Sequence, residues 1–128
     1  MPEAVKPSAD APAEAGSFES LRSEEVYPGV HRRTFSSHEA TINSYRFDPG
    51  ASFPLHSHPQ EQITLVTAGT VEMTVEGQTT TLESDSWSVV AGRVEHGITA
   101  GSEGASIVAL IVPRRQDPAE YELAEEGE

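Results

Sequence analysis

Residues 50–69 read GASFPLHSHPQEQITLVTAG and hold two of the chain's five histidines, His56 and His58. Side chains two positions apart on a β-strand point to the same face, so both imidazoles would project into one space. The same count places both glutamines of the stretch, Gln62 among them, on that face, and Glu61 on the opposite one. The spacing therefore favours a glutamine over the glutamate as the companion of the two histidines.

A further histidine, His96, follows a second turn in the stretch AGRVEHG. An antiparallel neighbouring strand could bring it back against the first pair. Neutral imidazoles with one more oxygen donor suit a divalent transition metal such as Zn, Ni, Fe, Mn or Co. On the spacing alone, two nearby histidines on the surface by coincidence are the alternative.

The rest of the chain's middle part is a series of short apolar runs with frequent turns. Val71, Met73 and Val75 alternate with polar residues, which indicates a half-buried strand, and EGQT at 76–79 follows as a hairpin turn. No stretch has a helical period. The predicted strands cover residues 29–35, 40–47, 61–69, 70–83, 86–92 and 105–113. This pattern predicts a single all-β domain, a sandwich or a barrel.

Both ends differ in composition from the middle. Residues 1–17 are rich in Ala, Pro and Glu, and residues 117–128 contain six acids and no base. We expect two loose tails around a domain at 18–116. The formal charge of −13 comes largely from these ends (net −2 and −6), so it indicates solubility. It argues against nucleic acid as a partner, because phosphates need a basic face.

Several other classes are excluded by what the sequence lacks. There is no cysteine, which removes disulfides, thiolate catalysis and cysteine-based zinc sites together. No basic start precedes an apolar run, and no apolar stretch approaches ~18 residues, so neither a signal peptide nor a membrane span is expected. We expect a cytoplasmic protein without a membrane partner.

The stretch at 50–69 resembles the first motif of the cupins, G-x5-H-x-H-x3/4-E-x6-G. Gly50, His56, His58 and Gly69 fall on it in register, and Gln62 stands where the motif has its glutamate. The second cupin motif, G-x5-P-x-G-x2-H-x3-N, is similar to residues 85–100, where His96 matches the ligand position. The other motif positions hold Asp85, Ala91, Arg93 and Ala100, and Gly92, one place early, would keep the turn flexible.

This resemblance implies a double-stranded β-helix, the cupin or jelly-roll barrel. It implies one divalent metal inside, held by His56, His58, Gln62 and His96. Three neutral imidazoles and a neutral amide leave the 2+ charge uncompensated, which favours anionic ligands and Lewis-acid chemistry. The remaining histidines, His31 and His38, are expected on the surface.

Among cupins, the motifs look closest to the small single-domain group of the pectin-degradation cupins. That group converts unsaturated uronates to linear keto sugars, and its metal site also carries a glutamine. On the last strand, this chain has Ala109 where the group has an acid for proton transfer, and Ile111 where it has an aromatic residue. An arginine, Arg115 (or Arg114), remains for a substrate carboxylate.

Other candidate catalytic residues are few. Tyr45, Arg46 and Arg33 lie on early strands and could face the cavity, where an arginine would clamp a carboxylate. Glu61 is expected to face outwards, Ser57 has no activating base, and Trp87 and Phe47 are expected in the core.

Three functions follow, in order of preference. The first is a metal-dependent isomerase, lyase or cyclase acting on a small oxygenated substrate such as a sugar acid or keto acid. The second is a metal-dependent dioxygenase. The third is a barrel that binds a small molecule without turnover, an alternative favoured by Ala109. We also expect a homodimer, with EEVYPGVHRRTF at 24–35 as the stretch through which two chains would pair.

Overall fold

The computed structural model describes residues 12–116 and 121–124. Nine strands and one short 3-10 helix, η1 (Phe18–Ser20), make up its regular structure. The strands are β1 (Glu24–Tyr27), β2 (Val30–Ser36), β3 (Thr41–Phe47), β4 (Ser52–Ser57), β5 (Glu61–Val75), β6 (Gln78–Leu82), β7 (Trp87–Val90), β8 (His96–Val112) and β9 (Glu122–Leu123). Within this described part, no helix is long and apolar enough to cross a membrane. The all-β prediction is confirmed.

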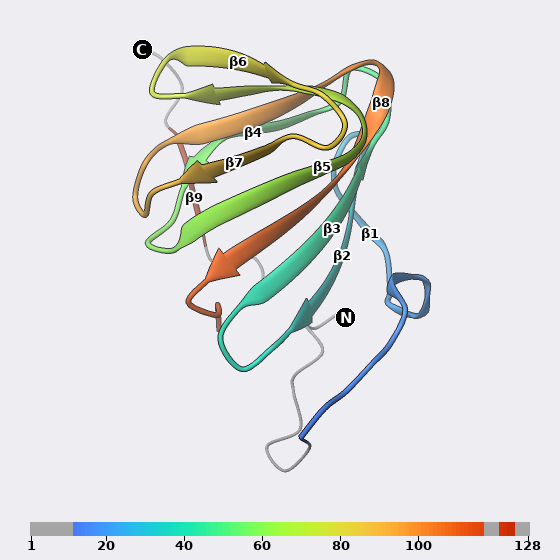
Figure 1. Cartoon of the computed structure of the whole chain (residues 1–128). Helices are drawn as coiled ribbons and strands as arrows, with labels where there is room; N and C mark the ends of the chain where they lie inside the picture. Colours follow the sequence, from blue (N-terminus) through green and yellow to red (C-terminus); the bar gives the residue numbers. More distant parts are fainter. Residues whose placement is uncertain (1–11, 117–120, 125–128) are drawn as a thin grey trace.

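Two long strands, β5 and β8, hold the barrel together because each belongs to both of its sheets (Figure 1). The first part of β5 pairs with β7 and with the end of β8, which continues to β3, β2 and β1. The second part of β5 pairs with β6 and with the start of β8, which continues to β4 and β9. All these pairs are antiparallel, as a curled sheet of hairpins requires.

The inner faces of the two sheets share one core. Val30, Phe47, Ile107 and Ile111 come from the first sheet, and Met73 from the second, and each is at most 2% exposed. On β5 the predicted alternation is confirmed, since Val71 and Met73 are buried while Glu72 is exposed. The expected hairpin follows at Glu76 and Gly77, both with positive φ, a turn whose twist matches that of the strands.

Several strand boundaries differ from the prediction. The two runs at 61–69 and 70–83 include one continuous strand, β5, and β8 starts earlier than expected, at His96. The strands β1 and β9 were not predicted. Of the two histidines that the spacing argument placed on a strand, His56 lies on β4 and His58 in the loop that follows it. Phe47 lies in the core as expected, but the prediction for Trp87 is wrong, because its side chain is 67% exposed on the outside of β7.

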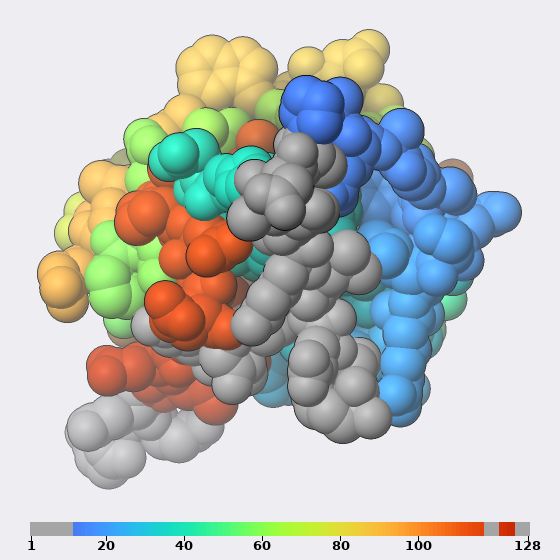
Figure 2. All heavy atoms as spheres, turned by 90° about the horizontal axis from the view of Figure 1, so that it is seen from below, coloured from blue at the N-terminus to red at the C-terminus, as the bar shows by residue number. Residues whose placement is uncertain are grey.

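The ends of the chain are described only in part. Residues 1–11, 117–120 and 125–128, most of the two predicted tails, lie outside the described residues. Inside the predicted C-terminal tail, residues 121–124 are not loose, because β9 pairs with β4 at His56 and Ser57. At the other end, Phe18 packs on Phe35 with ring centroids 5.8 Å apart. In the view from below, the described N-terminal residues (blue) accordingly lie against the barrel (Figure 2).

Candidate metal centre

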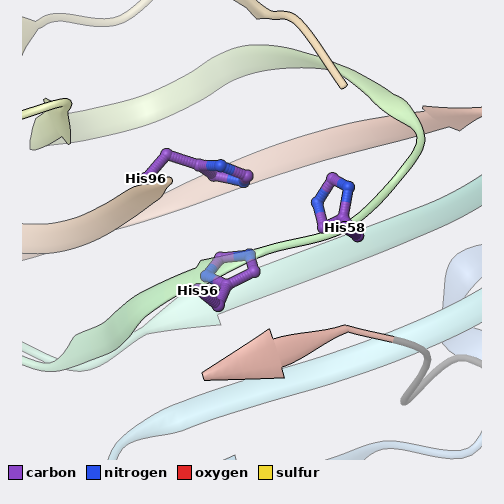
Figure 3. Close-up of side chains that lie close together, drawn as sticks. All are labelled: His56, His58 and His96. Carbon is purple, nitrogen blue, oxygen red and sulfur yellow. The ribbon is translucent and has the colours of Figure 1, made fainter. Parts of the chain in front are cut away.

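The three histidines of the cupin-like motifs meet inside the barrel (Figure 3). His56 lies near the end of β4 and His96 begins β8, and the two residues are direct partners in the antiparallel ladder. Their ring centroids are 4.2 Å apart. His58 follows β4 in the loop that leads into β5, with its ring 5.0 Å from that of His96. The predicted return of His96 against the first pair is therefore confirmed.

Backbone carbonyls fix the tautomer of all three rings. Each Nδ1 lies near a carbonyl oxygen two residues away: His56 to Pro54 at 2.9 Å, His58 to Gln60 at 3.0 Å, and His96 to Val94 at 2.9 Å. A carbonyl oxygen only accepts, so each Nδ1 must carry the proton and donate it. The Nε2 atom of each neutral ring is then an acceptor. This is the arrangement in which metal-binding imidazoles are usually held.

Gln62, the second residue of β5, brings its amide to the same point. Its Oε1 lies 3.2 Å from Nε2 of His58 and 3.2 Å from Nε2 of His96. Its Nε2 donates to the hydroxyl of Thr64 at 3.0 Å. Glu61 is exposed, as the spacing predicted.

Burial keeps the histidines neutral. Loss of water around His56 lowers its pKa to about 3, with the neighbouring His96 adding to the effect. The pKa of His58 is lowered to about 4, again first by burial and then by the charge of Arg115. Burial also lowers the pKa of His96, against the opposing effect of its bond to Val94. At neutral pH the three rings therefore present lone pairs, not protons.

A cation resolves the conflict that this arrangement creates. The amide oxygen of Gln62 lies 3.2 Å from Nε2 of His58 and 3.2 Å from Nε2 of His96; all three atoms are acceptors, and none of the described residues donates a hydrogen bond between them. The three histidine ligand atoms lie within 4.8 Å of one another. Two donors about 2.0–2.1 Å from a tetrahedral zinc ion are about 3.3 Å apart, close to the observed spacing. The three imidazole nitrogens and the amide oxygen are thus suitable ligands for a divalent transition metal.

Arg115 is the predicted carboxylate-binding residue that lies near the histidines. It is 6% exposed, and its backbone N–H donates to the hydroxyl of Thr41 at 2.8 Å. Its charge acts on the pKa values of all three histidines and of Tyr45. Tyr45 is also inside, and burial raises the pKa of its hydroxyl.

The other predicted candidates lie elsewhere. Arg46 is exposed and pairs with Asp48 at 3.0 Å, because β3 turns it to the outside. Arg33, also on an outward position, donates to the carbonyl of Phe18 at 3.1 Å, and Arg114 is exposed. Of the histidines expected on the surface, His38 is exposed; His31 is half-buried and lies 3.4 Å from Asp48.

Tyr121 is a neighbour of the site that the sequence analysis missed. Its ring lies edge-on to His56 with centroids 5.2 Å apart, and its hydroxyl is 2.8 Å from that of Tyr27. The guanidinium of Arg115 lies over the same ring, 5.8 Å from its centroid. One signal was present in the acidic run: Tyr121 and Leu123 alternate with acids, as strand residues do.

Two positions where the second cupin motif has glycine, one before β7 and one before His96, have a left-handed backbone in this chain although neither is glycine. Asp85 and Arg93 have φ values of 74° and 69°, the left-handed conformation that favours glycine. Gly92 has a different role from the one expected. A Cβ there would collide with the carbonyl oxygen of Pro59, so Gly92 permits close packing against the loop that carries His58.

Comparison with known proteins agrees with this geometry. Residues 43–113 match the model of the cupin domain family. The pectin degradation protein KdgF of Dickeya dadantii (strain 3937) is 27% identical over 96 residues, which are 73% of this chain and 87% of that protein. The structure of KdgF from Halomonas sp. has a TM-score of 0.71 and 27% identity, covering 80% of this chain and 97% of the other. An RmlC-like cupin from Shewanella frigidimarina NCIMB 400 has a TM-score of 0.73 and 26% identity, covering 81% and 95%. The chain therefore belongs to the cupin family, as a small cupin close to the KdgF group.

Proposed function

We propose that this chain is a metal-dependent enzyme, an isomerase, lyase or cyclase, whose substrate is a sugar acid or keto acid. The observation that carries the proposal is the close approach of three hydrogen-bond acceptors, the amide oxygen of Gln62 and the Nε2 atoms of His58 and His96. A bound cation would make this approach favourable. His56, His58, Gln62 and His96 would hold one divalent ion, Zn, Ni, Fe, Mn or Co. Bound there, the ion would supply a Lewis acid for a carbonyl or carboxylate oxygen.

The charge of the site favours an anionic substrate. The four side chains that would bind the ion are neutral, because the pKa values of the histidines are low and Gln62 is an amide. Arg115 adds a buried positive charge close to them. A carboxylate is the group that an arginine binds best, in a bidentate manner. Arg115 would thus orient the substrate by its carboxylate.

The residues available for proton transfer are hydroxyls. Among residues 12–116 and 121–124, no aspartate or glutamate is buried. Ala109 faces inward between Thr64 and Asn43, its partners on β5 and β3. Tyr45 is buried and the charge of Arg115 acts on its pKa, and the ring of Tyr121 lies against His56. Burial raises the pKa of both hydroxyls. Each would therefore act as a neutral proton donor.

The related proteins support this substrate class. The Dickeya relative is called a pectin degradation protein, and the motifs of this chain resemble those of the cupins that act on unsaturated uronates. A uronate carries both a carboxylate, which Arg115 would bind, and an oxygen next to the reacting carbon, which the ion would bind.

A non-catalytic binding barrel is the second candidate, favoured by the alanine at 109. Without a buried carboxylate, the same neutral site would still bind an anion through the ion and Arg115. Turnover decides between the two functions. We also propose, as the sequence led us to expect, that the protein is a homodimer and that it is cytoplasmic.

Elemental analysis of protein prepared without a histidine tag is the test of the metal. We expect near-stoichiometric metal in the wild type and at least a tenfold lower content in His56→Ala and His96→Ala. His38→Ala is the matched control, because it removes an exposed imidazole and should keep its metal. Equal metal content in all variants, or none in the wild type after reconstitution, would contradict the proposed centre.

Assays on unsaturated uronates and on keto acids then test the reaction. We expect turnover that depends on metal, and a large rise in KM for Arg115→Ala. If a metal-loaded wild type binds these acids without converting them, the binding barrel replaces the enzyme. Oxygen uptake with a redox-active metal would instead indicate that the protein is a metal-dependent dioxygenase.

A further inference from the structure

A row of polar side chains crosses the inner face of the first sheet. The inward residues that lie opposite one another on β2, β3, β8, β5 and β7 (Figure 1) are, in this order, Thr34, Asn43, Ala109, Thr64 and Ser88. We call these five residues the polar row, in which Ala109 is the one apolar member. The inner face of an antiparallel sheet is normally apolar, so this row requires a reason.

The polar row lies beside the candidate metal centre. Thr64 follows Gln62 by two residues on β5, so the row is about 7 Å from Gln62 along this strand. The two residues are in contact, since the amide of Gln62 donates to the hydroxyl of Thr64 at 3.0 Å. Asn43 lies two strands away, about 10 Å from Thr64, with Ala109 between them. A substrate of several carbon atoms held at the ion can therefore extend over the row.

Asn43 has a buried donor without a partner. Its side chain is 0% exposed, and its Oδ1 accepts a hydrogen bond from the hydroxyl of Thr34 at 2.7 Å. Its Nδ2, which carries two N–H bonds, has no hydrogen-bond partner among the described residues. A buried N–H without an acceptor destabilises a fold, and such groups are rare. Where one is retained, a functional site is the expected reason.

The neighbours of Asn43 in the polar row offer it no acceptor. Ala109, its direct partner on β8, ends in a methyl group. Thr64, on the other side of Ala109, is 0% exposed, and its hydroxyl accepts from Gln62 but donates to none of the residues that the structure describes. Two donors thus lie on either side of a methyl group. The group that would satisfy them is an oxygen acceptor.

We propose that Asn43 is a substrate-binding residue, whose Nδ2 donates to a substrate oxygen that neither the ion nor Arg115 binds. The inference rests on the proposed function, because the ion and Arg115 would hold the other end of the substrate. A simple acid has no further oxygen to offer Asn43, whereas a polyhydroxy acid has several. A site built to bond a hydroxyl strongly rejects the analogue that lacks it. Asn43 would therefore select polyhydroxy acids.

Titration of zinc-loaded protein with two acids, followed by NMR spectroscopy, tests the proposal. The probes are galacturonate, which carries hydroxyls along its chain, and acetate, which carries only a carboxylate. We expect Asn43→Leu, which has nearly the same shape but no amide, to bind galacturonate at least tenfold more weakly and acetate unchanged. Ser44→Ala is the matched control on β3, because Ser44 faces outwards; it should bind both acids as the wild type does.

The unfolding temperature of the metal-free protein is a second readout. Asn43→Leu should raise this temperature by a few degrees, because an apolar side chain replaces an amide whose N–H groups have no acceptor. The double variant Thr34→Val with Asn43→Leu should raise it as well, since it also removes the hydroxyl that bonds to the amide. A merely structural asparagine would give the opposite result.

Two results would overturn the inference alone. One is an unfolding temperature that falls in both variants, which would make the amide part of the fold. The other is a wild type that binds both acids and an Asn43→Leu protein that binds galacturonate equally well. A wild type that takes up no zinc, or that binds neither acid, would instead overturn the proposed function, and this inference with it.

Discussion

The amide of Gln62 differs from a carboxylate in its charge, and this difference defines the candidate metal centre. Its Oε1 is held against two imidazoles while its Nε2 donates to Thr64. A glutamate in the same place would keep one oxygen at the centre, and its second oxygen could accept from the Thr64 hydroxyl. The exchange of the two residues therefore changes the charge with little change of shape.

For Gln62→Glu we expect metal binding roughly tenfold tighter and anion binding weaker, because the carboxylate cancels part of the ion's charge. Competition with a chelator measures the first effect, and inhibition by a simple carboxylate measures the second. Gln62→Ala serves as the control: it should bind metal more weakly than the wild type. If Gln62→Glu also bound metal more weakly, the amide oxygen would not be a ligand.

At the scale of elements, the turn between β7 and β8 supports the loop that carries His58. The backbone N–H of Arg93 donates to the carbonyl of His58 at 2.6 Å. A Cβ on the neighbouring Gly92 would collide with the carbonyl of Pro59. The loop and the turn thus position each other through backbone atoms.

Gly92→Ala should displace this loop and lower metal affinity by at least tenfold. Arg93→Gly is the matched control in the same turn: it keeps the backbone bond, relieves a left-handed arginine, and should stabilise the fold by about 0.5–1 kcal/mol with unchanged metal affinity. Urea unfolding and metal titration measure the two quantities. Equal metal affinity in both variants would show that Gly92 does not position His58.

The short strand β9 covers His56 from the side. Its pairing with β4 and the Tyr121–Tyr27 hydroxyl pair hold the Tyr121 ring against that histidine. Tyr121→Ala should therefore expose His56 and speed removal of the metal by a chelator several-fold. Leu123→Ala, whose side chain is 53% exposed, should leave the rate unchanged. An unchanged rate in both would mean that β9 opens faster than the metal leaves.

How well the sequence predicts each strand depends on how clearly apolar and polar residues alternate along it. On β5 buried and exposed residues alternate over 61–66 and again over 71–73, on either side of an irregular stretch. The inward position of Gln62 was therefore predictable, although the spacing argument had to cross a loop at 58–60. On β7 both Trp87 and Val90 are apolar, and they point to opposite sides. Hydrophobicity alone does not tell an inward strand position from an outward, exposed one, so Trp87 was misplaced.

Arg115 and Tyr121 differ in how far the sequence could predict their place at the site. The family resemblance indicated Arg115 as a possible ligand for a carboxylate, and it lies near the histidines. Tyr121 comes from an acidic segment whose composition indicates a loose tail. The contacts that place it come from distant parts of the chain, above all β4, more than 60 residues earlier, and Tyr27. Contacts between such distant segments leave no local pattern in a single sequence.

At the scale of the whole molecule, the buried histidines make stability depend on pH when no metal is bound. The pKa of His56 is about 3 and that of His58 about 4 in the folded chain, against about 6.5 when unfolded. Between these values the unfolded chain binds protons that the folded chain does not. The contribution of these two histidines to the free energy of unfolding is therefore fully present above pH 6.5, and it is lost as the pH falls towards 3.

We expect the metal-free protein to lose a few kcal/mol of its free energy of unfolding between pH 7 and pH 4. Bound metal should add stability at pH 7, since it binds only the folded chain. Thermal unfolding across this range, with and without metal, measures both effects. A double variant, His56→Gln with His58→Gln, should flatten the dependence; an unchanged slope would attribute it to other groups.

The arrangement of β5 and β8 also decides which strand pairings must form before the candidate metal centre is complete. His56 and His96 become neighbours only when β8 has paired with β4, and Gln62 joins them only when β8 has paired with β5. Closing such distant segments is slow, because the entropy of a long loop is lost before the contacts form. Capture of a metal ion would thus require that both pairings have formed, and a metal-sensitive signal would report directly when they have.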